Sequence, residues 1–312
     1  MGAVLSVSEL KKTYEVRKTA FSIKKEVIRA VDGVSFDLGK GETLGLVGES
    51  GSGKSTLARC LLLLEMPDQG SITFQDRELT GLGRKDLLAI RRDMQIIFQD
   101  PYSSLNPRRK VYDIMAEPLL FHHIAEKAEV RDRVVEILEN VGLGVDFLSK
   151  FPHEMSGGQR QRVAIGRALA TSPVLVIADE PVSALDVSIQ AQIVNLFIDI
   201  REKLRISMLF ISHDLNIVRF ISDNIVVMYG GKILEEGTTD EVFYRPLHPY
   251  TRMLIGSIKG EYCKMTGREV RDAGEGCVYQ PRCGMKGPAC AKAQPELQGT
   301  KEHRVACFLA SA

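Results

Sequence analysis

The sequence contains no tryptophan and no long apolar run among its 312 residues. Its richest apolar stretch is the four leucines of Leu61–Leu64, whereas a membrane-spanning helix needs roughly 18 to 20 apolar residues. Neither sign of charge dominates, since 41 basic residues face 40 acidic ones. A chain-wide basic field is therefore absent, and we expect no nucleic-acid partner. The N-terminus lacks a basic segment followed by an apolar core, so no secretory signal is expected.

Cysteine is scarce and unevenly placed, with five of the six residues after position 260. Pairs with two-residue spacing, which are typical of zinc ribbons, are absent. Without a secretory signal, a local cluster favours metal or cluster binding over a disulfide framework. Cys263 departs from the spacing of the other tail cysteines, and Cys60 is expected to be a small core residue. Zinc, an iron–sulfur cluster and free thiols all remain open for Cys277, Cys283, Cys290 and Cys307.

Short apolar runs alternate with helical patterns through most of the chain. Near-continuous apolar strands of this kind predict a parallel sheet covered on both faces. A β-hairpin is predicted where Asn224–Tyr229 and Lys232–Glu235 flank Gly230 and Gly231. The other predicted strands are Thr43–Val47, Met94–Phe98, Val174–Ala178 and Met208–Ser212.

Three stretches differ from this alternation. Residues 16–28 are charged and predict a surface hairpin or loop between N-terminal strands. Residues 105–170 are mostly helical in pattern, most clearly at Val130–Asn140 and Gln159–Ala170, and predict a helical subdomain inserted in an α/β core. After about residue 246 the chain becomes rich in Pro, Gly, Cys and Lys. We therefore expect a core domain over residues 1–245 and a small C-terminal extension over residues 246–312.

The pattern GxxxxGK(S/T) occurs between the strand at Thr43–Val47 and a predicted helix. Its glycines let backbone N–H groups converge on a phosphate, and the helix N-terminus adds positive potential. Lys54 is expected to reach the β and γ oxygens of ATP, and the Ser55 hydroxyl to ligate Mg²⁺. The expected ATP-binding residues of this loop are Gly48, Ser50, Gly51, Gly53, Lys54, Ser55 and Thr56.

Two further motifs fit a nucleotide site. The strand at Val174–Ala178 leads into Asp179, which is expected to hold Mg²⁺ through a water, and Glu180, a candidate general base. Ser156 precedes two glycines at the start of a helix, so it can cap that helix while the backbone approaches an anion. Each motif alone has a plainer interpretation, as a strand end and as an ordinary capped helix.

Together these residues resemble the ATP-binding-cassette (ABC) ATPases, the motor subunits of ABC transporters, over nearly the whole chain. Met155–Gln159 is similar to the family signature, with Met where Leu is commonest, and Ser183–Asp186 is similar to the D-loop. Gln99 matches the glutamine loop, His213 the switch histidine and Tyr14 the aromatic residue that stacks on adenine. The resemblance implies a mixed α/β core of the P-loop ATPase type, with helices on both faces of the sheet, and ATP hydrolysis.

It also implies a composite site in a head-to-tail dimer. Each ATP would lie between the phosphate loop of one domain and the signature and D-loop of the other. His213 would contact the γ-phosphate, while Gln99 would sense that phosphate and Mg²⁺. The residues expected to act across the dimer are Ser156, Gly157, Gly158, Gln159 and Asp186.

Further segments resemble the oligopeptide/dipeptide importer ATPases: Phe98–Pro107, Asp179–Gln190 and His248–Thr251. Within this group, Pro181–Ser183 and Val187–Ile189 look more like the second, "F"-type ATPase subunit than the first. Nickel and metal-chelate importers belong to the same group and remain an alternative. A soluble ABC protein acting on ribosomes or DNA is disfavoured by the single cassette and the lack of a heptad run.

Membership of this group implies a set of partners and a location. These are a distinct homologous ATPase subunit, two permease subunits and an extracytoplasmic solute-binding protein, with this chain peripheral at the cytoplasmic face of the membrane. The permease is expected to dock near Gln99–Asn106. In the tail, Gly276-Cys277 and Pro281-Arg282-Cys283 resemble a recurring pattern of these ATPases, some of which hold a 4Fe-4S cluster. The resemblance thus favours a cluster on the four tail cysteines, structural by default and redox-regulatory as the alternative.

Overall fold

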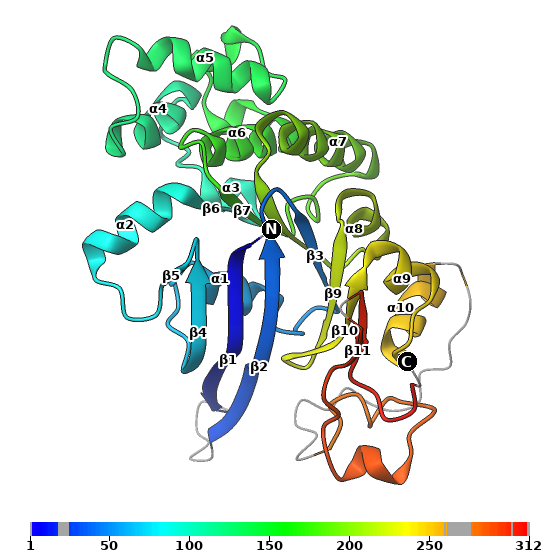
Figure 1. The fold of residues 1–312 in the computed structure, drawn as a ribbon. Helices are drawn as coiled ribbons and strands as arrows, with labels where there is room; N and C mark the ends of the chain where they lie inside the picture. The colour runs from blue at the N-terminus through cyan, green and yellow to red at the C-terminus, as the bar shows by residue number, and fades with distance from the viewer. Residues whose placement is uncertain (1, 18–24, 259, 261–275, 301, 311–312) are drawn as a thin grey trace. The chain divides into compact units, whose positions relative to one another are not determined.

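A computed structural model describes residues 2–17, 25–258, 260, 276–300 and 302–310. The chain divides into two compact units (Figure 1). The first comprises Met1–Gly39, Thr43–Gly81 and Ile211–Ala312, and the second comprises Lys40–Glu42 and Leu82–Phe210. Within the described residues, no helix combines the length and the apolar character that a membrane span requires. The predicted boundary at residue 245 stays a prediction, and Cys263 lies outside the described residues.

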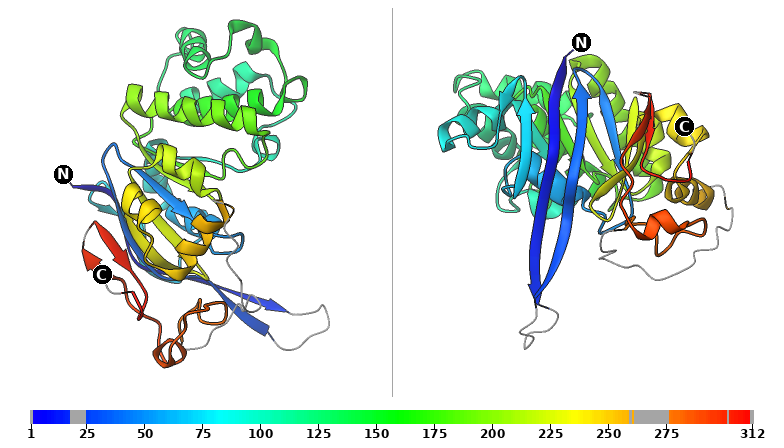
Figure 2. Two further views of the ribbon diagram at one scale, coloured as in Figure 1. Left: turned by 90° about the vertical axis from the view of Figure 1, so that its right-hand side faces the viewer. Right: turned by 60° about the horizontal axis from the view of Figure 1, so that its bottom comes forward.

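An antiparallel sheet in the first unit has the strand order β2-β1-β4-β5. Strands β1 (Ala3–Arg17) and β2 (Lys25–Gly39) pair along their whole length, out to Arg17 opposite Lys25. Figure 2 shows them as one long two-stranded ribbon. The surface hairpin or loop predicted at residues 16–28 includes residues 18–24, which lie outside the described residues. Strand β4 (Gln69–Phe74) pairs with β1, and β5 (Arg77–Glu78) pairs with β4.

The phosphate-loop strand β3 (Thr43–Val47) belongs to a second sheet and has the predicted bounds. It runs parallel to β9 (Asn224–Tyr229), which forms the predicted hairpin with β10 (Lys232–Thr238). All five residues of β3 are buried. Helix α8 (Leu215–Ile221) packs so closely on β3 that a Cβ on Gly45 would come within 2.1 Å of a Val218 methyl carbon. The remaining helices of the first unit are α1 (Lys54–Leu61), α9 (Thr239–Tyr244) and α10 (Pro249–Ile258).

The C-terminal extension adds strands that its composition did not predict. Strand β12 (His303–Val305) pairs with β10, and β11 (Gln298–Thr300) pairs with β12. Between α10 and these strands, the described chain contains one short 3-10 helix, η3 (Pro288–Ala291). The extension is therefore joined to the first unit by main-chain hydrogen bonds.

The second unit holds the predicted helical region. Its strands β6 (Met94–Ile97) and β7 (Leu175–Asp179) are parallel, and all five residues of β7 are buried. Strand β8 (Ser207–Ser212) leads the chain back into the first unit. The unit extends well beyond residues 105–170, so the limits of the helical subdomain stay a prediction. Its helices, green in Figure 1 except the cyan α2 and α3, are α2 (Arg84–Asp93), α3 (Pro101–Ser104), α4 (Val111–Phe121), α5 (Val130–Asn140), η1 (Val145–Ser149), η2 (Pro152–Glu154), α6 (Gly157–Leu169) and α7 (Val187–Leu204).

Candidate functional site

The loop between β3 and α1 requires its glycines for steric reasons. A Cβ on Gly48 would lie 2.2 Å from the carbonyl oxygen of Met228, and one on Gly53 would lie 1.9 Å from that of Ala30. Gly53 also has a φ of 105°, which residues with side chains rarely adopt. The loop therefore lies tightly against two backbone carbonyls, and glycine is the residue that fits at both positions.

Lys54 is the first residue of α1, and its side chain folds back into the loop. Its ammonium donates hydrogen bonds to the carbonyl oxygens of Gly48, at 2.7 Å, and Glu49, at 3.0 Å. The residue is buried, as is Thr56, whereas Ser50 and Gly51 are exposed and Ser55 is intermediate. A cation and a helix N-terminus thus meet at one loop, an arrangement that suits an anionic ligand.

The candidate base lies in the second unit, immediately after β7. Asp179 ends the strand and is buried, and Glu180 has a φ of 47°, in the left-handed region. Gln99 donates a hydrogen bond from Nε2 to Oε2 of Glu180 at 3.3 Å. Two side chains that the sequence predicted separately are thereby brought together. Strained backbone at a non-glycine residue costs about 1–3 kcal/mol and is concentrated at functional sites.

The signature motif forms the N-terminus of α6. Ser156 accepts a hydrogen bond from the backbone N–H of Gln159 at 3.3 Å, and the Gln159 side chain accepts one from the N–H of Ser156 at 3.0 Å. This reciprocal capping box satisfies two N–H groups at the helix start. A Cβ on Gly158 would lie 2.6 Å from a methyl carbon of Ile189, whereas one on Gly157 would meet Leu185 at 3.3 Å. The two glycines thus permit close packing against the start of α7.

Asp186, predicted to act across a dimer, caps α7 within its own chain. Its carboxylate accepts hydrogen bonds from the Ser188 hydroxyl at 2.8 Å and the Ile189 N–H at 3.1 Å. These hydrogen bonds, the one from Ser188 above all, lower the pKa of the carboxyl group. Asp186 therefore stays charged at neutral pH and has a structural role that its D-loop position did not reveal.

His213 and Tyr14 belong to the first unit. His213 is exposed directly after β8, where Asp214 caps α8 by accepting a hydrogen bond from the Asn216 N–H at 2.8 Å. Tyr14 is half-buried on β1 and donates its hydroxyl hydrogen bond to Glu65. Burial, followed by this hydrogen bond, raises the pKa of Tyr14. Glu65 was not singled out from the sequence because no local motif contains it.

The four tail cysteines lie in one small region. Cys277, Cys283 and Cys290 are buried, and Cys307 is half-buried. The Cys277 N–H donates to the Cys290 carbonyl at 2.8 Å, an approach that Gly276 allows because a Cβ there would lie 2.7 Å from the same oxygen. Burial raises the pKa of the Cys277 and Cys283 thiols, and the thiols of Cys290 and Cys307 are near enough to add to the increase.

The described part of the chain contains no group of three or more His, Cys, Asp or Glu side chains arranged to hold a metal ion. The 4Fe-4S cluster predicted from the sequence therefore has no support from the side-chain geometry. The donor chemistry alone, four neighbouring thiols, is compatible with such a cluster or with zinc.

Glu49, inside the phosphate loop, is a residue that the motif leaves unspecified. Its backbone N–H donates to the Tyr250 hydroxyl at 2.8 Å. Its carboxylate accepts two hydrogen bonds from the Arg282 guanidinium, at 2.6 and 3.1 Å. Both partners occur in tail segments that the sequence analysis noted only as family resemblances. The acidic side chain of Glu49, in the same loop as the predicted phosphate-binding Lys54, is the one sequence signal that could have indicated a distant cation.

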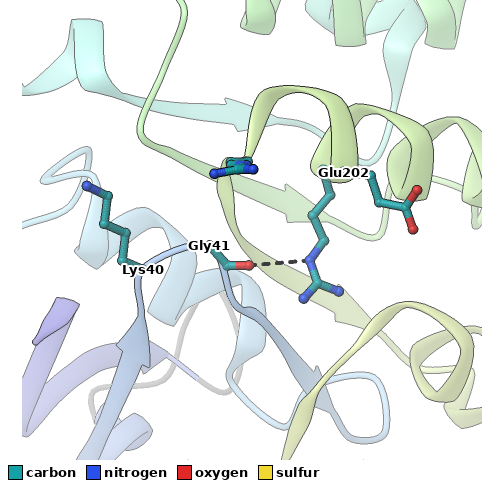
Figure 3. Close-up of a pocket in the computed structure, with 5 residues that line it drawn as sticks. Lys40, Gly41 and Glu202 are labelled. Carbon is teal, nitrogen blue, oxygen red and sulfur yellow. Dashed lines mark hydrogen bonds between the residues drawn. The ribbon is translucent and has the colours of Figure 1, made fainter. Parts of the chain in front are cut away.

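A hollow of about 470 Å³ lies in the second unit. Figure 3 shows Lys40, Gly41 and Glu202 around it, and Arg201 Nε donates to the Gly41 carbonyl at 3.4 Å. The other lining residue is Arg205. None of the predicted nucleotide-binding residues lines this pocket.

Comparison with known proteins adds to this geometry. The ABC transporter family profile matches residues 31–183, and the profile for the oligopeptide/dipeptide transporter C-terminal region matches residues 234–290. The chain is 31% identical to a dimeric bacterial ABC transporter cassette, MJ0796, with a TM-score of 0.67 over 75% of this chain and 98% of that one. A post-hydrolysis dimer of MJ0796 bound to ADP and Pi gives 30% identity and the same TM-score over the same shares of the two chains. These likenesses confirm the predicted mixed α/β fold of an ABC ATPase.

Curated relatives match almost from end to end. The oligopeptide transport ATP-binding protein AppF of Bacillus subtilis is 44% identical, over 99% of this chain and 98% of its own. OppF of Escherichia coli, also an oligopeptide transport ATP-binding protein, is 44% identical over 98% and 96%. The dipeptide transport ATP-binding protein DppF of Escherichia coli is 42% identical over 98% and 94%. The chain therefore belongs to the ATP-hydrolysing subunits of ABC transporters, in the oligopeptide/dipeptide transporter family.

Proposed function

We propose that this chain is the motor subunit of a peptide importer. The observation that carries the proposal is the end-to-end similarity to oligopeptide and dipeptide transport ATPases, which includes the C-terminal extension. The solved cassettes leave a quarter of this chain unmatched, whereas the profile of the oligopeptide/dipeptide transporter C-terminal region matches residues 234–290. The extension thus distinguishes this chain from a generic cassette.

Reconstitution tests this proposal. The chain would be co-expressed with the permease and ATPase genes next to its own, and the complex placed in proteoliposomes with a solute-binding protein from the same locus. We expect ATP-dependent uptake of a labelled tripeptide and stimulation of ATPase activity by the peptide-loaded binding protein. Uptake of a nickel chelate without any peptide uptake would assign the chain to metal import instead. If no permease co-purifies and no solute stimulates hydrolysis, the transport function is wrong.

The phosphate loop is proposed to bind the β and γ phosphates of ATP. The buried Lys54 ammonium and the N-terminus of α1 supply positive charge there, and Gly48 and Gly53 keep the backbone free of side chains. The exposed Ser50 and Gly51 leave this loop open to solvent on one side. Tyr14 is proposed as the adenine-stacking residue.

Ser55, Asp179 and Gln99 are proposed as oxygen donors for Mg²⁺. A hydroxyl, a carboxylate and an amide carbonyl fit the preference of Mg²⁺ for oxygen ligands. When bound, the ion would neutralise charge on the phosphates. Glu180 is proposed to polarise the attacking water and His213 to contact the γ-phosphate. The left-handed backbone at Glu180 and its hydrogen bond with Gln99 support a functional role for this carboxylate.

A head-to-tail dimer is proposed, in which Ser156, Gly157, Gly158 and Gln159 contact the nucleotide of the partner. The N-terminus of α6 supports this role, because Ser156 and Gly157 are exposed at the surface of this chain. Asp186 is proposed to reach the same interface. The dimeric solved cassettes support such pairing, and the "F"-type resemblance favours a distinct ATPase subunit as the partner.

The permease contact is proposed at Gln99–Asn106, at the cytoplasmic face of the membrane. This segment includes the short helix α3, which Asp100 caps by accepting hydrogen bonds from the N–H groups of Tyr102 and Ser103. Tyr102 is largely exposed and offers an apolar contact. Cysteine cross-linking from Ser103 in the reconstituted complex should capture a permease subunit. If cross-links form elsewhere on the chain and none at this segment, the docking site is wrong.

A 4Fe-4S cluster on Cys277, Cys283, Cys290 and Cys307 remains a proposal based on ligand chemistry. Anaerobically purified protein should absorb near 400 nm, and Cys283→Ser should remove this band. If the protein instead contains stoichiometric zinc and lacks this band, the four cysteines form a zinc site. If it contains neither iron nor zinc, the four cysteines are reduced thiols.

A further inference from the structure

Two residues of the C-terminal part of the chain hold one residue of the phosphate loop. Arg282 binds the Glu49 carboxylate in a two-pronged ion pair, and Tyr250 accepts a hydrogen bond from the Glu49 N–H. Arg282 is 7% exposed and Glu49 is 32% exposed. All three residues belong to the first unit. A bidentate charged pair of this kind fixes orientation as well as distance.

The two holding residues are themselves rigidly supported. Tyr250 is fully buried, and its ring lies 4.8 Å from that of Tyr229 and 5.4 Å from that of Tyr279. The Arg282 guanidinium also donates to the Tyr229 hydroxyl at 3.4 Å. His248 adds a further contact, because its Nδ1 accepts a hydrogen bond from the Tyr250 N–H at 3.0 Å. Burial of the three rings and the guanidinium leaves little freedom for Arg282 to move away from Glu49.

Arg282 is also part of the cysteine-rich tail. Its N–H and that of Cys283 both donate to the Tyr279 carbonyl at 3.0 Å, so one tight turn carries both side chains. Cys277, two residues before Tyr279, is joined through its N–H to the Cys290 carbonyl. A change in the tail backbone therefore reaches the guanidinium through a short stretch of hydrogen-bonded chain.

Glu49 is the only acidic residue in the loop from Gly48 to Ser55. A carboxylate in this loop without a cation would oppose the binding of the phosphates of ATP, because like charges repel each other more strongly outside bulk water. Arg282 removes that repulsion and also holds the carboxylate to one side. If the loop bound no anion, the ion pair between Arg282 and Glu49 would affect only the stability of the protein.

We propose that Arg282 is a positioning residue for ATP binding, which holds Glu49 away from the phosphates and makes the affinity of the loop depend on the cysteine-rich tail. The inference rests on the proposed phosphate-binding role of the loop. In this mechanism Arg282 contacts neither the nucleotide nor the attacking water. It acts only through Glu49.

Steady-state ATPase kinetics with four variants test the role of the pair. Arg282→Met keeps most of the buried side-chain volume and leaves Glu49 without its cation. This variant should raise KM for ATP about tenfold and leave kcat within about twofold of the wild-type value. The expected size follows because hydrogen bonds to charged groups are worth at least about a factor of ten. Arg282→Lys should recover part of the loss. Glu49→Gln should change KM little, and Glu49→Gln combined with Arg282→Met should restore KM to near the wild-type value.

A matched control separates positioning from stability. Arg304, in the same tail, donates to Glu236 on β10 at 2.6 Å, an ion pair that does not involve the loop. Arg304→Met should lower the melting temperature as Arg282→Met does, without raising KM. If Arg282→Met leaves KM unchanged, or if the double variant is as impaired as the single one, the positioning role is overturned.

A tail variant tests the dependence on the cysteine region. Gly276→Ala places a Cβ 2.7 Å from the Cys290 carbonyl and so must shift that segment. KM should rise in the wild-type background and stay constant in the Glu49→Gln/Arg282→Met background. A rise of equal size in both backgrounds, or no rise in either, would overturn the dependence on the tail. Failure of the wild-type protein to bind ATP at all would instead contradict the proposed function of the loop.

Discussion

The two units support their nucleotide-related residues in different ways. In the second unit the support is mostly local: Ser156 and Gln159 cap each other, Asp186 accepts hydrogen bonds from the Ser188 hydroxyl and the Ile189 N–H, and Glu180 follows its own strand. In the first unit the phosphate loop depends on distant segments, because Glu49 binds residues 201 and 233 positions away. Local support follows from a short motif, whereas distant support depends on the whole fold of its unit.

This difference determines how strongly each motif responds to structural changes in distant parts of the chain. A capped helix start keeps its geometry as long as the helix exists, so the signature motif depends mainly on α6 itself and on the start of α7, which Gly158 contacts. The phosphate loop is exposed to changes in α10 and the tail, which gives the chain a place where its extension can affect ATP binding.

Glu180→Gln is the most direct test of the second unit, whose residues are supported mainly by nearby sequence. The amide cannot act as a base, so kcat for ATP hydrolysis should fall on the order of a thousandfold, while the affinity for ATP stays within about threefold. The measurement is single-turnover hydrolysis with parallel equilibrium binding of a fluorescent ATP analogue. Wild-type turnover in this variant would remove Glu180 from the mechanism.

Gly53→Ala tests the distant contacts of the loop. Its Cβ would meet the Ala30 carbonyl at 1.9 Å, so we expect a loss of at least about 3 kcal/mol in the free energy of unfolding and loss of ATP binding. Gly81→Ala is a matched control, because Gly81 has a similar φ of 106° and no atom within 4 Å of an added Cβ. It should cost only the backbone strain, about 1–2 kcal/mol, and leave binding intact. Equal losses in urea denaturation would mean that strain alone explains both.

The outcome for the sequence-based predictions follows the same division. The strand at Thr43–Val47, the hairpin around Gly230 and the cap at Ser156 were predicted because each depends on residues close together in the chain. The partners of Glu49 and Tyr14 could not be predicted, since no local pattern relates Arg282 or Glu65 to them. Strand β12 was missed for the same reason, because three residues without alternation gain their order from β10.

His248, which accepts a hydrogen bond from the Tyr250 N–H, should make the stability of the protein depend on pH. Burial lowers its pKa from 6.5 to about 4, against the opposing effect of Glu235 and with a small contribution from Arg252. Because the unfolded chain binds a proton below about 6.5 that the folded chain resists down to about 4, stability should fall as pH decreases through this window. The full effect is about 3 kcal/mol in the free energy of unfolding.

Urea denaturation at pH 7.5, 5.5 and 4.5 measures the contribution of His248. His248→Asn keeps an acceptor near the Tyr250 N–H and has no titratable ring, so its stability should depend less on pH than that of the wild type. His303, which also contacts Glu235, is present in both proteins and cancels in the difference. Identical pH profiles would show that the pKa of His248 is the same in the folded and unfolded chains.

Ser156→Ala should have the smallest effect. Loss of the cap costs about 1 kcal/mol in the free energy of unfolding, because the Gln159 N–H loses its partner. Ser188→Ala is the control, since its hydroxyl only supports the exposed Asp186, and it should change stability by less than about 0.5 kcal/mol. A cost well above that of a cap would indicate that the signature has wider contacts in this unit.

The pairing of β12 with β10 has a consequence for anyone who shortens the chain. A protein ending before His303 would leave the outer edge of β10 without hydrogen-bonding partners, and such an edge is a template for pairing with another molecule. Truncations made to remove the cysteines would therefore tend to self-associate, and aggregation could be mistaken for loss of a metal site. Single substitutions keep the protective last strand in place and give the cleaner experiment.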